Sequence, residues 1–354
     1  MITASPLPHI LGLLPEQLVD HAHAHGVALR IDEARRLIVD AQAAPGKQRR
    51  RNPVAAATRE AVAAIVRDEP LEILERATDP QDGFVKYLLR SPDDDAVFEA
   101  VRIPLHSPGR FSVCLSSQVG CAMRCGFCAT GRLGLRRHLA PWEMVASWRA
   151  IRDEAPGTVT GAVFQGQGEP LHNYDAVMQA ARILSDPNGG RIAAKAITIS
   201  TVGLVAQIRR FTQERQPYRL IASITTTKVD QRKRLLPVAG AVDFDELSAA
   251  LREYALTSGN RLTIAWVLIA GVNTDPSEVE GLRRAFDQVP FVLNLIDVND
   301  AREDGFTQAD DDERNSFIDA LVQAGIPFRR RYSGGAARHA ACGMLAATRS
   351  EARQ

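Results

Sequence analysis

Residues 116–131, SSQVGCAMRCGFCATG, place Cys121, Cys125 and Cys128 within one short stretch. The spacing is C-x3-C-x2-C, and the remaining two of the five cysteines lie outside the stretch. Thiolates are ligands for soft or borderline metals. Three of them in one loop therefore indicate a metal or redox site, and the rest of the chain is best examined outward from this loop.

The composition is that of a globular protein. The 354-residue chain is 45% hydrophobic and 24% charged, which is enough apolar material for a buried core. No apolar run approaches the ~18–20 residues that cross a bilayer, and the N-terminus lacks the positive start of a secretory signal. We therefore predict a cytoplasmic, membrane-free protein, in which cysteines more often act as ligands or redox groups than as structural disulfides.

The charge distribution says more than the net charge, which is only +1. Basic residues form four clusters, at 47–51, 132–138, 232–234 and 329–331. Separate solvated faces are one explanation for any single cluster. Four clusters in a nearly neutral chain favour a phosphate-binding surface instead, provided that they converge in space.

Two kinds of sequence pattern divide the chain. Residues 1–52 have helical spacing and predict a small N-terminal helical accessory domain. Residues 53–96 predict a connecting helical segment. From Val97 onward, short β-rich runs alternate with helical patterns, so residues 97–354 are predicted to form the catalytic core.

The core pattern is that of an α/β protein. The predicted strands are 98–104, 110–117, 161–166, 195–201, 218–225, 261–270, 290–298 and 326–332. Repeated β-then-α units indicate a parallel sheet, either open and doubly wound or curved into a barrel. No nucleotide-binding glycine fingerprint accompanies a strand. Too few units follow residue 110 for an eightfold barrel, so we predict a partial barrel.

The three-cysteine loop lacks the features of a zinc site. Zinc sites usually pair two C-x2-C knuckles, and neither a second pair nor a histidine stands beside this loop. A four-iron cluster held by three cysteines leaves one iron without a protein ligand. That open iron can bind a small molecule, which makes the cluster a site of chemistry. Zinc binding and three free thiols remain as alternatives.

The loop follows a strand and carries Phe127 beside its last cysteine, and it resembles the cluster loop of the radical S-adenosylmethionine (SAM) superfamily. The resemblance implies a [4Fe-4S] cluster on Cys121, Cys125 and Cys128, with S-adenosyl-L-methionine as the second cofactor. In that superfamily the open iron chelates the amine and carboxylate of the cofactor. Reduction of the cluster then splits the sulfonium and yields a 5′-deoxyadenosyl radical.

Further motifs narrow the resemblance. The chain is similar to the RlmN/Cfr family of RNA methylases in CLSSQVGCAMRCGFCATGRLGLRR, GQGEPLHNYDAV, TISTVG and AACGML. The resemblance covers roughly residues 97–346. It implies a partial (βα)6 barrel of the radical SAM type with a small N-terminal accessory domain, acting on an adenine ring carbon of RNA.

The resemblance also implies which residues bind the cofactor. Gly168 and Glu169 match the family's Gly-Glu pair, where glycine permits close backbone approach and the carboxylate suits an ammonium group. A simple turn with an exposed acid is the alternative. The other implied cofactor-binding residues are Ser200, Ser223, Ile224, Thr225 and Asn299. Several of them stand at carboxyl ends of predicted strands, where an α/β active site is built, although ordinary capping would explain any one alone.

The two outlying cysteines acquire roles in the same way. Cys342 matches the cysteine that the family methylates and whose methylene then joins the adenine carbon. Cys114 matches the resolving thiol that attacks the sulfur of that adduct, an ordinary thiol exchange. Glu99 matches the family's proton-accepting glutamate. From residues alone, Cys342 would equally be a small buried hydrophobe.

Several positions depart from the family pattern. Gln167 replaces a methionine before the Gly-Glu pair, Thr225 replaces a cofactor-contacting histidine, and Arg338-His339 replace an acidic approach to Cys342. The groups that carry the chemistry are retained while their surroundings differ, which leaves the particular RNA and ring carbon open.

We therefore predict a SAM-dependent methylase of the adenine C2 carbon in rRNA, and of tRNA as a further substrate. It would be a monomer and would take electrons from a reductase or flavodoxin-type donor. The same machinery acting at C8 of 23S rRNA, as in Cfr, is the nearest alternative. A non-catalytic iron–sulfur RNA-binding protein is another, but such a protein would need neither Glu99 nor Cys114 nor Cys342.

Overall fold

The computed structural model describes residues 7–43, 54–300, 302, 305–331 and 341–345. Within this part of the chain, ten strands form one sheet in the order β1-β2-β3-β4-β7-β8-β9-β10-β11-β12. The predicted cluster of basic residues at 47–51 and the departure at Arg338-His339 lie outside the described residues.

The parallel part of the sheet forms the predicted core. Its strands are β4 (Arg110–Leu115), β7 (Thr158–Phe164), β8 (Ile197–Thr201), β9 (Arg219–Ser223), β10 (Leu262–Leu268), β11 (Phe291–Asp297) and β12 (Phe328–Arg331). Each pairs in parallel with its neighbour. The sheet ends at β12 rather than closing on itself. The predicted partial barrel is therefore confirmed.

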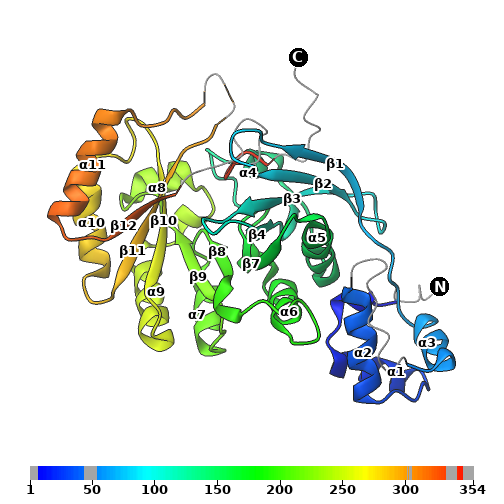
Figure 1. Ribbon diagram of the computed structural model, residues 1–354. Coiled ribbons are helices and arrows are strands. Elements are labelled where there is room, and N and C mark those ends of the chain that lie inside the picture. Colours follow the sequence, from blue (N-terminus) through cyan, green and yellow to red (C-terminus); the bar gives the residue numbers. More distant parts are fainter. Residues whose placement is uncertain (1–6, 44–53, 301, 303–304, 332–340, 346–354) are drawn as a thin grey trace.

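Helices connect these parallel strands and cover one face of the sheet (Figure 1). They are α5 (Pro141–Glu154), α6 (Tyr174–Ser185), α7 (Val205–Gln213), α9 (Phe244–Ser258), α10 (Pro276–Phe286) and α11 (Asp311–Gln323), with the short α8 (Val229–Leu235) before α9. In the described part of the chain, no helix is both long and apolar enough to cross a bilayer.

Three of these helices begin at an aspartate, which fixes where the preceding loop ends. The side chains of Asp243, Asp275 and Asp310 accept backbone N–H groups in the first turns of α9, α10 and α11. Aspartate satisfies N–H groups that a helix start leaves without partners and suits the positive end of the helix dipole. These caps set the lengths of the loops that enter the helices.

The sheet continues past β4 as an antiparallel extension of β1 (Glu72–Thr78), β2 (Val85–Arg90) and β3 (Val97–Pro104). The helical connection predicted over residues 53–96 is therefore wrong for its second half. Only α3 (Ala56–Ala63) is helical in that range. The cause is burial: β2 is buried on both faces, and a short, continuous apolar run has no period that separates strand from helix.

The first helices lie at one side of the core (Figure 1). They are η1 (Ile10–Gly12), α1 (Pro15–Ala24) and α2 (Ile31–Gln42). Here η1 packs against α5 and against α2, and α1 packs against α2. The rings of His9 and Trp142 stack with centroids 4.3 Å apart, and Arg149 donates to the carbonyl of Ala41 at 2.6 Å. The division at residues 52 and 96 into separate domains stays a prediction.

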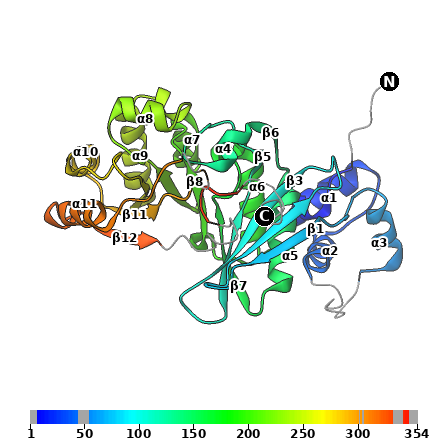
Figure 2. The same ribbon diagram turned by 90° about the horizontal axis from the view of Figure 1, so that it is seen from above.

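Two small elements after β4 carry the three-cysteine loop. They are the hairpin of β5 (Gln118–Gly120) with β6 (Leu135–His138), and α4 (Ala129–Leu133) between its strands. Figure 2, which views the molecule from above, shows α4, β5 and β6 beside α8. The loop therefore lies at the carboxyl ends of the parallel strands.

Candidate active site

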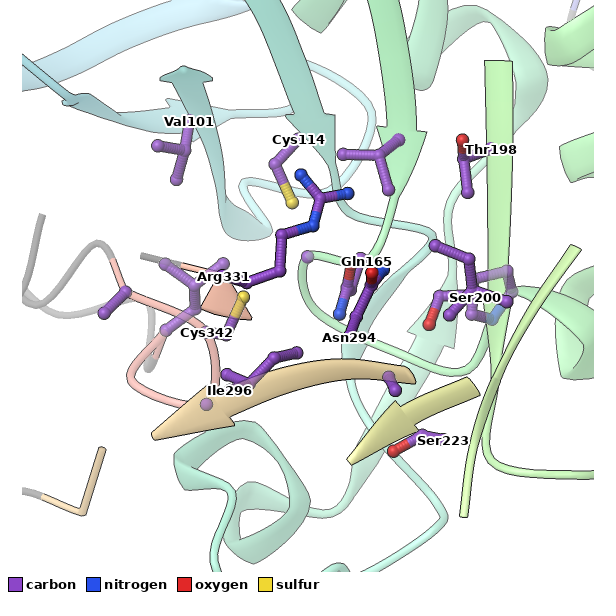
Figure 3. Close-up of a pocket in the computed structure, with 18 of the residues that line it drawn as sticks. Val101, Cys114, Gln165, Thr198, Ser200, Ser223, Asn294, Ile296, Arg331 and Cys342 are labelled. Atoms are coloured by element: carbon purple, nitrogen blue, oxygen red, sulfur yellow. The ribbon is translucent and has the colours of Figure 1, made fainter. Parts of the chain in front are cut away.

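A cavity of about 470 Å³ lies at the carboxyl ends of the parallel strands (Figure 3). Strands β3, β4 and β7 to β12, the cysteine loop and the segment 341–345 contribute to its wall. Predicted site residues on this wall are Cys114, Cys121, Cys125, Cys128, Gly168, Glu169, Ser200, Ser223, Asn299 and Cys342. Glu99, Ile224 and Thr225 are not on the wall. One cavity thus brings together residues from distant parts of the sequence.

Backbone contacts fix the cysteine loop on both sides. The N–H of Cys121 donates to the carbonyl of Gly134 at 2.9 Å, and the N–H of Gly126 donates to the carbonyl of Leu235 in α8 at 2.9 Å. Gly131 of α4 lies so close to the loop that a Cβ there would stand 2.9 Å from the nitrogen of Cys125. The loop conformation therefore depends on a glycine inside α4 as well as on the cysteines.

The three thiols lie in mainly apolar surroundings. Cys121 and Cys125 are buried beside Leu235, Leu236 and other apolar side chains, and Cys128 is half-buried. Burial raises the pKa of Cys121 to about 12 and the pKa of Cys125 well above its ordinary value. Thiolates there need a positive partner, which a bound metal supplies.

The arrangement fits a polynuclear cluster better than a single metal ion. Within the described residues, no three His, Cys, Asp or Glu side chains surround one point closely enough to hold one ion. A tetrahedral zinc requires such convergence. In an iron–sulfur cluster each thiolate bonds a different iron, so the sulfurs stand further apart. Three soft donors on one cavity wall therefore fit an iron–sulfur cluster.

The loop after β7 presents Gly168 and Glu169 to the cavity. Gly168 has φ +100°, and a Cβ there would stand 2.6 Å from the Cβ of Gln118. The N–H of Glu169 donates to Oε1 of Gln118 at 2.9 Å. Only glycine fits this contact, so the loop is held tightly against β5.

The Glu169 carboxylate is buried but well supplied with donors. Its Oε2 accepts from the N–H of Val202 at 2.9 Å, and its Oε1 accepts from the N–H of Leu171 at 3.1 Å. Burial raises the pKa of Glu169 to about 7, although these hydrogen bonds oppose the rise. An exposed turn, the alternative reading of this motif, is excluded. A buried carboxylate at a cavity wall suits an ammonium group.

This pKa predicts a pH-dependent affinity for SAM. As pH falls below 7, Glu169 becomes neutral and can no longer pair with the cofactor ammonium. We expect the dissociation constant, measured anaerobically with the reconstituted protein, to rise by up to about tenfold per pH unit between pH 7 and 5. The Glu169→Gln variant should bind SAM weakly, and its dissociation constant should change less with pH. The change that remains reports the titration of the cofactor's own groups. Identical profiles for both proteins would show that this carboxylate is not the partner.

The polar residues at the strand ends are divided between the cavity and the core. Ser200, Ser223 and Asn299 are on the cavity wall. The side-chain amide of Asn299 donates to the carbonyl of Asp297 at 3.1 Å and to that of Cys342 at 3.4 Å. Asn299 therefore stands next to the segment that carries Cys342.

Ile224 and Thr225 are fully buried behind the wall. Thr225 has φ +63°, which is a strained conformation for a β-branched residue. Its carbonyl accepts from the side chain of Asn273 at 2.6 Å, while its Oγ1 has no hydrogen-bond partner among the described residues. Contact between the cofactor and the side chains of Ile224 and Thr225 therefore stays a prediction. The cavity does not support it, because neither residue lines the wall.

The C-terminal segment brings Cys342 to the cysteine loop. The N–H of Ala129 donates to the carbonyl of Gly343 at 2.7 Å, and Oγ1 of Thr130 donates to that of Leu345 at 2.6 Å. Leu345 also packs with Val101 and Cys114. The two cysteines that lie furthest from the loop in the sequence are thus beside it in the fold.

Cys114 and Cys342 direct their sulfur atoms into the same part of the cavity, and the side chain of Arg331 extends between them (Figure 3). Burial raises the pKa of Cys114 far above its ordinary value, and the nearby Cys342 raises it further. The surrounding protein also raises the pKa of Cys342, while the Arg331 guanidinium opposes that rise. Arg331 therefore favours the thiolate of Cys342, the nucleophilic form.

Glu99 lies behind the cavity wall in β3. It is fully buried, and its Oε1 forms an ion pair with Nζ of Lys86 in β2 at 3.0 Å. Its N–H donates to Oε1 of Gln167 at 3.1 Å, and its carbonyl accepts from Oγ of Ser116 at 2.5 Å. At Gln167, the departure from the family pattern supplies an amide oxygen that accepts the N–H of Glu99, a bond that a methionine thioether would accept only weakly.

Two of the residues around the site were not found from the sequence. Lys86 stands inside the apolar run VKYLL, and a lysine in a strand buried on both faces is the signal that could have identified it. Arg331 was assigned only to a basic cluster. Its position as the last residue of β12 became informative once the fold placed that residue on the cavity wall.

Two arginines of the predicted basic clusters, Arg137 and Arg232, are engaged in contacts within the fold. Arg137 pairs with Asp94 and Glu143, each at 2.8 Å. Arg232 is buried and donates to two backbone carbonyls. Within the described residues, several of the predicted phosphate contacts therefore hold the fold together instead.

Comparisons with known proteins agree with this geometry. Residues 115–276 match the radical SAM superfamily. A "Probable RNA methyltransferase" of Anaeromyxobacter sp. (strain Fw109-5) is 48% identical over 270 residues, which cover 76% of this chain and 79% of the relative. A "Probable dual-specificity RNA methyltransferase RlmN" of a Synechococcus species is 37% identical over 287 residues, 79% of this chain and 80% of the relative.

A solved structure extends the likeness to the whole fold. The crystal structure of a radical SAM methyltransferase from Sphaerobacter thermophilus has a TM-score of 0.86 and 34% identity, and the match covers 96% of this chain and 100% of that one. Identity at this level over most of the chain confirms the resemblance inferred from the cysteine loop. The chain belongs to the RlmN-like family of radical S-adenosylmethionine RNA methyltransferases.

Proposed function

We propose that this enzyme methylates the C2 carbon of an adenine in rRNA and also accepts tRNA, using Cys342 as the methyl carrier and Cys114 as the resolving thiol. The observation that carries the proposal is that both sulfur atoms face one cavity that also contains the three loop cysteines and Glu169. A cluster that served only as a sensor or a structural element would require neither outlying thiol.

The cofactor groups fit the residues present. Cys121, Cys125 and Cys128 would hold a [4Fe-4S] cluster, and Gly168, Glu169 and the polar strand ends would hold SAM. When bound, these groups supply a methyl donor and a 5′-deoxyadenosyl radical, with the electron coming from a reductase or flavodoxin-type donor. The buried, mainly apolar surroundings of the loop exclude water from this chemistry.

The protein side chains then carry the one-carbon unit. The Cys342 thiolate, favoured by Arg331, accepts the methyl group, and its carbon later bonds to the adenine carbon. Glu99 accepts the proton from that ring carbon, the electron pair of the C–H bond stays in the ring, and a bound cluster would take up the single electron that the adduct must lose. The Cys114 thiolate then attacks the sulfur of Cys342 and a disulfide forms. The electron pair of the broken S–C bond goes to the former methylene carbon, which takes up a proton and becomes the methyl group of the product.

The product of the reaction tests this proposal. Reconstituted protein, SAM, a flavodoxin-type reductant and rRNA or tRNA should yield 2-methyladenosine, identified by mass spectrometry of the digested RNA. The Cys342→Ala variant is the matched control and should yield none. Formation of 8-methyladenosine would favour the alternative at C8. The absence of any methyladenosine from both RNAs, despite cofactor cleavage, would contradict the proposal.

A further inference from the structure

The ion pair between Lys86 and Glu99 is buried deep in the sheet. Lys86 is 3% exposed and Glu99 is 0% exposed, and their charged groups are 3.0 Å apart. Lysine and glutamate are rarely buried so completely, and replacing such a pair by apolar side chains often does not reduce stability. The pair is therefore better explained by what it does for the site than by what it adds to folding.

The pair lies on the face of the sheet that carries the resolving thiol. Lys86 of β2 stands opposite Val101 of β3, which in turn stands opposite Cys114 of β4. Glu99 precedes Val101 by two residues, and residues two apart in a strand point to the same face. Ammonium, carboxylate and thiol are thus neighbours on one face, and the thiol reaches the cavity wall.

The backbone of Glu99 is anchored to the cofactor loop. Gln167 accepts its N–H, and Gln167 directly precedes Gly168 and Glu169. Ser116 links the same elements, because its Oγ donates to the carbonyl of Glu99 and accepts the N–H of Gln167. The carboxylate of Glu99 is therefore fixed by its backbone from one side and by Lys86 from the other.

A carboxyl group without solvent exposure prefers its neutral form unless a positive charge lies beside it. A neutral acid cannot accept a proton. We propose that Lys86 is a positioning residue that keeps Glu99 ionised and oriented, so that its carboxylate can take the proton from the adenine ring carbon. This inference rests on the proposed function, since it needs the covalent RNA adduct as the source of the proton.

The variants Lys86→Met and Lys86→Gln test the proposal in the full-length reconstituted enzyme. Both remove the positive charge, and the glutamine keeps a hydrogen-bond donor. Turnover to methyladenosine should fall about 100-fold or more, which is the range of a lost general base. Cleavage of SAM and methylation of Cys342 should stay near the wild-type level. Protein covalently joined to RNA should accumulate on denaturing gels, because the proton is not removed.

Two further readouts separate this role from a merely structural one. Turnover of the variants should recover at higher pH, where Glu99 regains its charge, while the wild-type enzyme should gain less. The double variant Lys86→Met with Glu99→Gln should recover thermal stability but not turnover.

Specific outcomes would overturn the inference. Undiminished turnover in both single variants, with 2-methyladenosine still made by the wild-type enzyme, would refute the role of Lys86 and leave the proposed function intact. If the Lys86 variants instead lose SAM cleavage, Cys342 methylation and thermal stability to the same extent, Lys86 only supports the fold. That result would also refute the proposed positioning role.

Discussion

Alanine in place of Cys121, Cys125 or Cys128 is expected to remove the brown iron–sulfur absorbance and to reduce cleavage of SAM to background. All three side chains are on one cavity wall and have no disulfide partner. Each thiolate would bond a different iron, so that losing one leaves an iron without its protein ligand. The measurements are iron and sulfide content after anaerobic reconstitution, and 5′-deoxyadenosine by chromatography.

The matched control for this experiment is Cys342→Ala. It removes a thiol from the same cavity but leaves residues 121–128 intact, so absorbance and SAM cleavage should both remain. A protein with all three loop cysteines replaced that still bound four irons and cleaved SAM would refute the cluster assignment. A single bound zinc in the wild-type protein would refute it equally.

The parallel sheet is the part of the fold that sequence patterns predict best. Strands such as 262–268 and 291–297 are short, rich in aliphatic and aromatic residues and separated by helical patterns. Because parallel strands end at the same edge of a sheet, polar residues placed at those ends, such as Ser200, Ser223 and Asn299, were predicted to lie together, and they share one cavity.

The antiparallel extension could not be predicted in the same way. In β2, side chains on both faces are buried, so the alternation that identifies a strand is absent. The role of Lys86 could not be predicted either, because the pairing of β2 with β3 determines that its partner is Glu99. When strand register determines which residue a side chain pairs with, that partner can be identified only once the register is known.

The clusters of basic residues were a poor guide to the charged surface for a related reason, because the sequence does not show where each side chain points. Adjacent basic residues suggest a shared surface, but Arg137 turns to Asp94 and Glu143, and Arg232 turns into the core. Sequence proximity gives no information on side-chain direction at the end of a strand or in a short helix. Surface charge can be assigned only after the acidic partners have been located.

The placing of Cys114 and Cys342 in one cavity is the feature that sequence reasoning could predict least. Nothing in residue spacing joins a strand in the first third of the chain to the C-terminal segment, and only the family resemblance paired them. In the fold, the segment is held by hydrogen bonds from Ala129 and Thr130 of α4. The helix that follows the cysteine loop thus also holds the segment that carries Cys342, the proposed methyl carrier.

This arrangement predicts opposite results for the two outlying cysteines. With Cys342→Ala, SAM cleavage should continue while methyl transfer to RNA falls to background, because no sulfur carries the one-carbon unit. Peptide mass analysis of the wild-type protein should show Cys342 as S-methylcysteine. Cys114 should carry no methyl group, because burial raises its pKa and leaves little thiolate to react with a methyl donor.

With Cys114→Ala, the methylene of Cys342 can still bond to the adenine carbon, but no thiol then attacks the sulfur. The enzyme should accumulate covalently attached to its RNA, visible as a ribonuclease-sensitive shift on a denaturing gel. Val163→Ala is the matched control, since it changes a neighbour of Cys114 on the same wall without removing a thiol. If Cys114→Ala turns over normally, or if its only defect is a lost cluster, the resolving role is refuted. Cys114 would then be a strand residue that packs against Val101 and Leu345.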